Sequence, residues 1–106
     1  MRLKKSWTVA AANALLNSSG PFPNKKVIWD CGNGATGEII SSLISKLPGE
    51  HQVLFEEIDG TFPNHHPDPV VDENLELLRD KMLQTNADLG IAFDGDGDRI
   101  GVLSKE

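Results

Sequence analysis

Cysteine and long apolar runs are scarce in this sequence, and each scarcity narrows the class of protein. The single cysteine, Cys31, cannot form an internal disulfide and is compatible with a reducing compartment. No apolar run approaches the roughly 18 residues that a membrane span requires, and no apolar segment like a signal peptide follows the basic N-terminus. We therefore expect a cytoplasmic protein that does not enter a membrane.

Basic side chains are also few, with 10 lysines and arginines against 16 aspartates and glutamates and a net charge of -6. Thirteen of the acidic side chains fall in residues 56–106. This balance argues against nucleic acid or an anionic membrane as the main partner, and it favours a cation in the acidic half. At 106 residues and 39% hydrophobic content, the chain is sized for one domain, residues 1–106.

Hydrophobic periodicity predicts helices that alternate with short buried strands. The expected elements are a helix over 6–17, a strand over 27–29, a helix over 37–47, a strand over 53–58, a helix over 72–86, and strands over 88–93 and 100–103. The expected core stripes are Ile39, Ile40, Leu43, Ile44 and Leu47 in the second helix and Leu75, Leu78 and Met82 in the third. This order predicts an α/β fold with three α/β/α layers and a small, mostly parallel sheet of about four strands, the last antiparallel.

Three carboxylates stand at alternate positions in Asp94-Gly-Asp-Gly-Asp98, directly after an apolar run. The run predicts a buried strand that delivers this acidic turn to the sheet edge where α/β folds bind ligands. The glycines allow Asp94, Asp96 and Asp98 to converge, and an oxygen-only cluster suits a hard cation such as Mg²⁺. The plain alternative is a solvated acidic turn, since Asp and Gly both favour turns.

Arg99 follows the acidic turn at once. A guanidinium matches phosphate oxygens two at a time, so a cation beside an arginine is typical of phosphoryl-transfer sites. Balancing the charge of the aspartates is the alternative role. The turn does not fit an EF-hand calcium loop, because counting from Asp94 places Arg99 and Lys105 where Gly and Glu are needed.

The segment 30–37 is expected to leave the same edge of the sheet and contains Gly32-Asn-Gly-Ala-Thr-Gly37. This G-x-G-x-x-G follows a predicted strand and opens a predicted helix, and Glu57 lies twenty residues beyond it. It is therefore also the pattern of a dinucleotide-binding turn, although glycines serve any tight strand-to-helix turn. Asn33 is a candidate contact in this segment, and Cys31 is expected to be a small buried filler.

The segment 59–71 is expected at that edge too, and its three prolines favour a shaped, functional loop. It carries the adjacent histidines His65 and His66, which are candidate contacts because an imidazole can bind metal, donate to phosphate or move a proton. The alternative is a surface loop whose imidazoles are merely hydrogen-bonded.

Four stretches, in this order, together match one known family: Val27-Ile-Trp-Asp-Cys-Gly-Asn-Gly34, Asp59-Gly-Thr-Phe-Pro-Asn-His-His-Pro-Asp-Pro69, Ala87-Asp-Leu-Gly-Ile-Ala-Phe93 and Asp94-Gly-Asp-Gly-Asp-Arg99. The chain resembles the second domain of the α-D-phosphohexomutases, the phosphoglucomutase/phosphomannomutase family. The residues of these four stretches are most similar to those of bacterial enzymes with both phosphomannomutase and phosphoglucomutase activity.

The resemblance implies a four-domain enzyme that moves a phosphoryl group between C1 and C6 of a hexose, through a phosphoserine and a bisphosphorylated sugar. It implies that Asp94, Asp96 and Asp98 hold Mg²⁺ against that phosphoserine and that Arg99 contacts phosphate. The partners would be mannose or glucose 1- or 6-phosphates and the other domains. No stretch here resembles the phosphoserine loop or the sugar-binding loops, so we expect an excised domain that is inactive alone.

Three rival functions stay open on the sequence. One is a dinucleotide-binding oxidoreductase domain that uses residues 32–37. Another is a phosphatase-like domain with Asp94 as an aspartyl nucleophile, since a strand that ends in Asp-x-Asp also suits that chemistry. The third is a cation-binding module without enzymatic activity.

Overall fold

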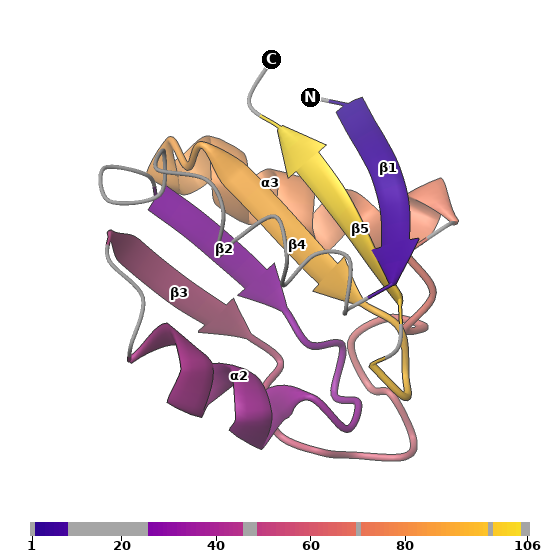
Figure 1. Ribbon diagram of the computed structural model, residues 1–106. Coiled ribbons are helices and arrows are strands. Elements are labelled where there is room, and N and C mark those ends of the chain that lie inside the picture. Colours follow the sequence, from indigo (N-terminus) through magenta and orange to yellow (C-terminus); the bar gives the residue numbers. More distant parts are fainter. Residues whose placement is uncertain (1, 9–25, 46–48, 70, 98, 105–106) are drawn as a thin grey trace.

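A five-stranded sheet with the order β1-β5-β4-β2-β3 forms the centre of the molecule. The computed structural model describes residues 2–8, 26–45, 49–69, 71–97 and 99–104, and the statements below concern these residues. Strands β2 (Lys26–Asp30), β3 (Glu50–Leu54) and β4 (Leu89–Phe93) are parallel. Strand β5 (Arg99–Ser104) runs antiparallel to β4, and β1 (Arg2–Thr8) runs antiparallel to β5 (Figure 1).

Helices lie on both faces of this sheet, so the domain has three layers. Helix α3 (Glu76–Thr85), preceded by the 3₁₀ turn Asp72–Leu75, lies behind the sheet in Figure 1, and α2 (Gly37–Ile44) lies on the other side, near β3. Alternate residues of a strand point to opposite faces. Trp29 of β2 accordingly packs in the cluster on the α2 side, and its neighbour Ile28 packs in the cluster on the α3 side.

The face covered by α3 is closely packed. The predicted stripe Leu75, Leu78 and Met82 is fully buried there, which confirms it. A Cβ at Gly90 of β4 would collide with the sulfur of Met82 and the side chain of Leu78. Gly90 therefore lets the helix approach the strand closely, which is a recognised use of glycine within a sheet.

The predicted fold class is confirmed, and three details differ. The helix predicted over residues 6–17 is wrong for residues 6–8, which belong to β1; residues 9–17 lie outside the described part. Strand β1 also makes the sheet five-stranded rather than four-stranded. It pairs with β5, which is more than 90 residues away along the chain, so local periodicity carries no signal of the pairing.

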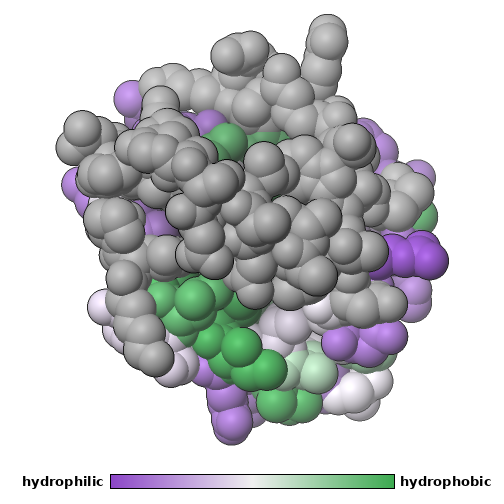
Figure 2. Space-filling model, in the orientation of Figure 1, coloured by the Kyte–Doolittle hydropathy of each residue, from purple (hydrophilic) through white to green (hydrophobic). Residues whose placement is uncertain are grey.

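The other two differences concern the strand predicted over 53–58 and the apolar stripe of α2. The strand runs from Glu50 to Leu54 instead, and the chain turns away at Phe55, which has a φ of 54°. In α2, Ile40 is buried as predicted but Ile39 is 67% exposed. Leu47 lies outside the described residues. Figure 2 shows apolar surface over α2 on this side of the molecule. Within the described part of the chain, no helix is long and apolar enough to cross a membrane.

Candidate metal centre

Three loops meet at the carboxyl ends of the parallel strands, as the sequence predicts. They are the glycine turn (residues 30–37), the proline loop (residues 59–71) and the acidic loop (residues 94–99). The amide of Ala35 donates to the carbonyl oxygen of Gly95 at 3.1 Å, and the amide of Asp59 donates to that of Asn33 at 2.9 Å. The glycine turn is therefore hydrogen-bonded to both of the others.

The acidic loop closes the short connection between β4 and β5. The amide of Asp94 donates to the carbonyl of Arg99, and the amide of Arg99 returns a bond to Oδ1 of Asp94, each at 3.2 Å. The amide of Gly97 donates to the carbonyl of Asp94 at 3.1 Å, and Gly97 has a φ of 75°, which favours glycine. These bonds curl the loop so that Asp94 is half-buried and Asp96 is exposed.

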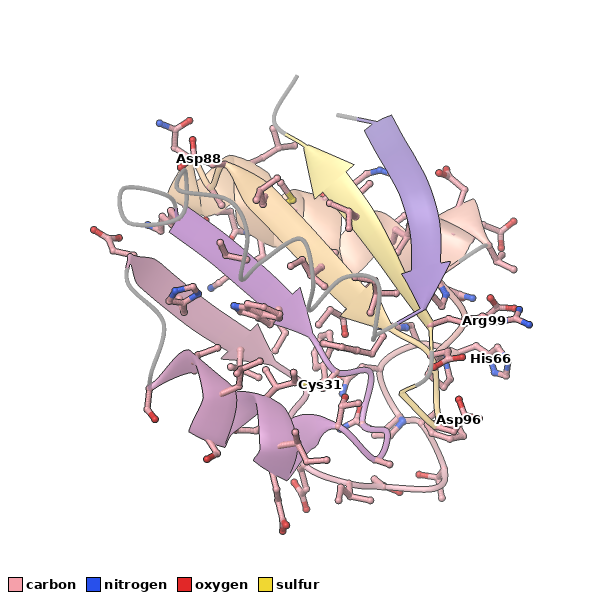
Figure 3. The ribbon with its side chains drawn as sticks, viewed as in Figure 1. Cys31, His66, Asp88, Asp96 and Arg99 are labelled. Atoms are coloured by element: carbon pink, nitrogen blue, oxygen red, sulfur yellow. The ribbon has the colours of Figure 1, made fainter. Side chains whose placement is uncertain are left out.

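The donor chemistry of this loop fits Mg²⁺. Asp94 and Asp96 are hard oxygen donors in one tight turn, and Mg²⁺ is typically bound by one or two carboxylates plus water or phosphate oxygens. Asp98 lies outside the described residues, and among those that are described no three His, Cys, Asp or Glu side chains form a metal-binding group. Asp94, Asp96 and Asp98 remain predicted ligands. Figure 3 shows Asp96, Arg99 and His66 at this end of the sheet, with Asp88 at the opposite end.

A buried ion pair lies beneath the loops. Asp30, the last residue of β2, has a fully buried side chain whose Oδ2 is 2.7 Å from Nε2 of His65 in the proline loop. Its other oxygen, Oδ1, accepts the amide of Gly32 at 2.8 Å. The side chain of His65 is 10% exposed. Burying a carboxylate requires a charged partner and hydrogen bonds, and Asp30 obtains both from the adjoining loops.

The hydrogen-bond partners of His65 favour its positively charged form. Its Nδ1 lies 2.9 Å from the carbonyl oxygen of His66, and its Nε2 faces the Asp30 carboxylate. The carbonyl oxygen and an ionised carboxylate are both acceptors, so both ring nitrogens donate to them, which only the imidazolium can do. The hydrogen bond to Asp30 raises the pKa of His65 above the usual imidazole value, and this effect outweighs the opposing effect of burial.

Two of the three candidate loop contacts hold the loops together. His65 does so through Asp30, and Asn33 does so with its side-chain amide. Nδ2 of Asn33 donates to the carbonyl of Glu57, and its Oδ1 accepts Nδ2 of Asn64, both at 2.8 Å. His66 differs from them because its ring is exposed and meets the edge of Phe62 with a centroid distance of 6.3 Å.

The glycines of the G-x-G-x-x-G segment are occupied by packing within the protein. A Cβ at Gly34 would lie 2.7 Å from the carbonyl oxygen of Gly95, and one at Gly37 would collide with the carbonyl of Glu56. A Cβ at Gly32 would lie 3.1 Å from Cβ of Pro67. Close contact with neighbouring loops explains these residues, without a bound dinucleotide.

Backbone strain is concentrated in the same loops. Four described residues other than glycine have positive φ, and three of them, Asn33, Phe55 and Phe62, lie in the glycine turn or in the segment that leads into and through the proline loop. The fourth, Asn86, ends helix α3. Such conformations persist only where the surroundings hold them, and they cluster at functional sites.

Cys31 is buried next to this site, and burial raises the pKa of its thiol to about 11. A thiol of that kind is a poor nucleophile. The prediction that Cys31 is a small buried filler is confirmed.

Sequence reasoning missed two residues that shape the site. Asp30 carries no predicted role of its own, although an acidic residue at the end of a buried strand requires a partner inside the protein. Thr36 was also missed: a Cβ at Gly97 would collide with its side chain, so Thr36 supports the acidic loop from below. No local pattern marks that contact.

Comparison with known proteins identifies the domain. The family profile described as "Phosphoglucomutase/phosphomannomutase, alpha/beta/alpha domain II" matches residues 8–106. The chain therefore belongs to the phosphoglucomutase/phosphomannomutase family and corresponds to its second α/β/α domain. In a crystal structure of a protein of this family from Burkholderia thailandensis, the match has a TM-score of 0.75 at 41% identity and covers 92% of this chain and 21% of that one.

Individual relatives agree. A phosphomannomutase/phosphoglucomutase from Pseudomonas putida is 58% identical over 79 residues, which is 74% of this chain and 17% of that protein. A phosphoglucomutase from Neisseria meningitidis is 46% identical over 81 residues, 76% of this chain and 18% of that protein. The matched segment thus covers less than a fifth of the length of these relatives.

Proposed function

We propose that this chain supplies the Mg²⁺ site of a phosphohexomutase, an enzyme that moves a phosphoryl group between C1 and C6 of mannose or glucose phosphates through a phosphoserine and a bisphosphorylated intermediate. Family membership supports the reaction class. The observation that carries the metal role is the closed acidic loop, which presents Asp94 and Asp96 at the carboxyl edge of the sheet and is hydrogen-bonded to the glycine turn.

The residues of the acidic loop would have two roles, metal binding and phosphate contact. Asp94, Asp96 and Asp98 would hold Mg²⁺, which supplies positive charge to the oxygens of the transferred phosphoryl group. Arg99 begins β5, and its exposed side chain would contact the same phosphate. The backbone amide of Arg99 keeps Asp94 oriented through its bond to Oδ1.

The rest of the active site would lie outside this chain. The relatives are more than five times as long as the segment they share with it, which leaves room for the phosphoserine and the sugar-binding loops. We propose that these are supplied by other domains of the same protein, that this domain alone is inactive, and that the enzyme is cytoplasmic. The buried, unpaired thiol of Cys31 is in keeping with a reducing compartment.

A Mg²⁺ titration followed by amide chemical shifts tests the metal role. We expect shifts at Gly95, Gly97 and Arg99 in the parent chain and their loss in Asp96→Ala. The matched control is Asp80→Ala, which removes an exposed aspartate from α3 and should titrate like the parent. Absence of shifts in the parent, or equal shifts in Asp96→Ala, would refute the proposal.

The rivals have their own readouts. A titration with NAD that shifts residues 32–37 would favour the dinucleotide-binding function, and a fluoride complex trapped on Asp94 would favour the phosphatase-like function. In the complete enzyme, Asp96→Ala should abolish mutase activity and leave the circular dichroism spectrum unchanged. Normal turnover by that variant would overturn the assigned role.

A further inference from the structure

We propose that Asp30 and His65 form a positioning pair for the acidic loop: the hydrogen bond between their side chains fixes the proline loop, and the proline loop fixes the backbone that presents Asp94 and Asp96. This inference rests on the proposed metal role of the acidic loop and names two residues outside that loop on which the role depends. Three contacts connect the pair to the acidic loop.

The first step is the ion pair, which joins two loops at a buried point. Asp30 stands at the end of β2, whose backbone is paired to strands on both sides and is therefore fixed. The bond of 2.7 Å to Nε2 of His65 attaches the proline loop to this fixed end. Because the side chain of Asp30 is fully buried, water does not compete for the carboxylate, and the bond is stronger than a surface pair.

The second step runs from His65 to Pro67. Nδ1 of His65 donates to the carbonyl of His66, and the amide of Asp68 donates to the same carbonyl oxygen at 2.9 Å. The segment 65–68 is thereby closed on itself around that oxygen. The position of the His65 ring consequently determines where the intervening Pro67 lies.

The third step is the contact between Pro67 and the acidic loop. Pro67 is buried between Gly32 and Gly95: a Cβ on Gly32 would lie 3.1 Å from Cβ of the proline, and one on Gly95 would lie 3.4 Å from its Cγ. Gly95 separates Asp94 from Asp96, and its carbonyl is held by the amide of Ala35. The loop is thus held by a hydrogen bond from the glycine turn and by the proline ring.

Hydrogen exchange and Mg²⁺ affinity measured on His65→Ala test the pair. The amide of Ala35 reports on the loop contact, and the amide of Asp88, bonded to the carbonyl of Lys26 at 2.8 Å at the other end of β2, reports on the sheet. We expect His65→Ala to speed exchange at Ala35 more than at Asp88. We also expect it to weaken Mg²⁺ binding about tenfold, the lower end of the effect of removing a group that orients the ligands.

His51→Ala is the matched control. His51 is also a partly buried histidine, and its Nδ1 accepts Nε1–H of Trp29 at 3.0 Å near the start of β3, away from the three loops. We expect its removal to lower the stability of the fold through the loss of this bond, without touching the pair. We expect the control to bind Mg²⁺ like the parent, and an equal loss of affinity in both variants would refute the proposal.

Asp30→Asn is the conservative variant. It keeps the proposal testable if His65→Ala does not fold. An asparagine keeps an acceptor for the amide of Gly32 and can donate to Nε2 of a neutral His65, so the loop contact survives without the charges. We expect it to retain most of the Mg²⁺ affinity and the protection of Ala35.

The outcomes separate the two proposals. If the parent binds no Mg²⁺, the proposed metal role is wrong. Hydrogen exchange at Ala35 in His65→Ala still shows whether the pair positions the acidic loop. If the parent binds Mg²⁺ and His65→Ala binds it equally well with unchanged exchange at Ala35, the pair has no positioning role and the metal role stands. If Asp30→Asn loses affinity as far as His65→Ala, the geometry of the pair is not what matters and the proposal is wrong.

Discussion

The glycine turn and the acidic loop follow the neighbouring parallel strands β2 and β4. The aspartates of these two segments are used in opposite ways. Asp30 ends β2 with no exposed side-chain surface, and both its oxygens are bonded within the protein. In the acidic loop after β4, Asp94 is half-buried and Asp96 exposed. The two segments are joined by the bond from Ala35 to Gly95. Asp30 therefore stabilises the loops at this end of the sheet, whereas Asp94 and Asp96 lie nearer to the solvent on one of these loops.

The difference shows that the role of an acidic residue at a strand end depends on whether its side chain can reach water. A carboxylate without access to water must be paired inside the protein, and both oxygens of Asp30 are used in this way. Carboxylates kept near water retain lone pairs for a cation. Four substitutions test the comparison, in order from the largest expected change in unfolding free energy to the smallest.

Asp30→Ala should cost about 3–5 kcal/mol, because removing one partner of a buried pair leaves the ring of His65 and the amide of Gly32 buried without their acceptor. Urea denaturation followed by circular dichroism measures the loss. The control is Asp72→Ala, which removes an exposed aspartate paired with Arg79 and should cost about 0–1 kcal/mol. Equal losses in the two variants would show that Asp30 is no more important than a surface ion pair.

Gly34→Ala should cost about 1–3 kcal/mol, since overpacking at a close contact has that effect. The added Cβ would lie 2.7 Å from the carbonyl oxygen of Gly95 and would push the acidic loop away. We expect amide shifts at residues 94–97 together with the loss of stability. Gly60→Ala, where nothing lies within 4 Å of the added Cβ, should stay within about 0.5 kcal/mol; unchanged shifts in Gly34→Ala would contradict the packing argument.

The contribution of His65 should depend on pH. Its pKa is raised in the folded state by Asp30, so its stabilising effect is complete below the unfolded pKa of about 6.5 and is lost as pH rises through the folded pKa. Each unit of difference between the two pKa values contributes about 1.4 kcal/mol. The difference in unfolding free energy between the parent and His65→Gln should shrink as pH rises from about 6 to about 9. A pH-independent difference would contradict a charged His65.

Asp96→Ala should have the smallest effect, within about 0.5 kcal/mol without metal, because the side chain is exposed. Its effect should appear when Mg²⁺ is added, since a bound ion stabilises only the folded state that binds it. Thermal unfolding with and without Mg²⁺ measures this. A variant whose midpoint rises with Mg²⁺ as much as that of the parent would remove Asp96 from the metal site.

Most of the fold could be predicted from local patterns, and the exceptions share a cause. The buried stripe of α3 and the order of β2, β3, β4 and β5 follow from periodicity and turn residues. Strand β1 was missed because it forms by pairing with the far end of the chain. Ile39 was misplaced because apolar spacing predicts which residues share a face, and not whether another element covers that face.

The amino-acid sequence alone identifies the three loops of the site, which are the acidic loop, the glycine turn and the proline loop. It does so because strand ends and turn-forming residues are local features. It also identifies the family, through four motifs in order. The tertiary structure alone decides that Asp30 pairs with His65, that Pro67 lies against Gly95, and that the glycines serve close packing. These contacts join residues that are distant in sequence, and burial, which sets their strength, is a property of the assembled layers.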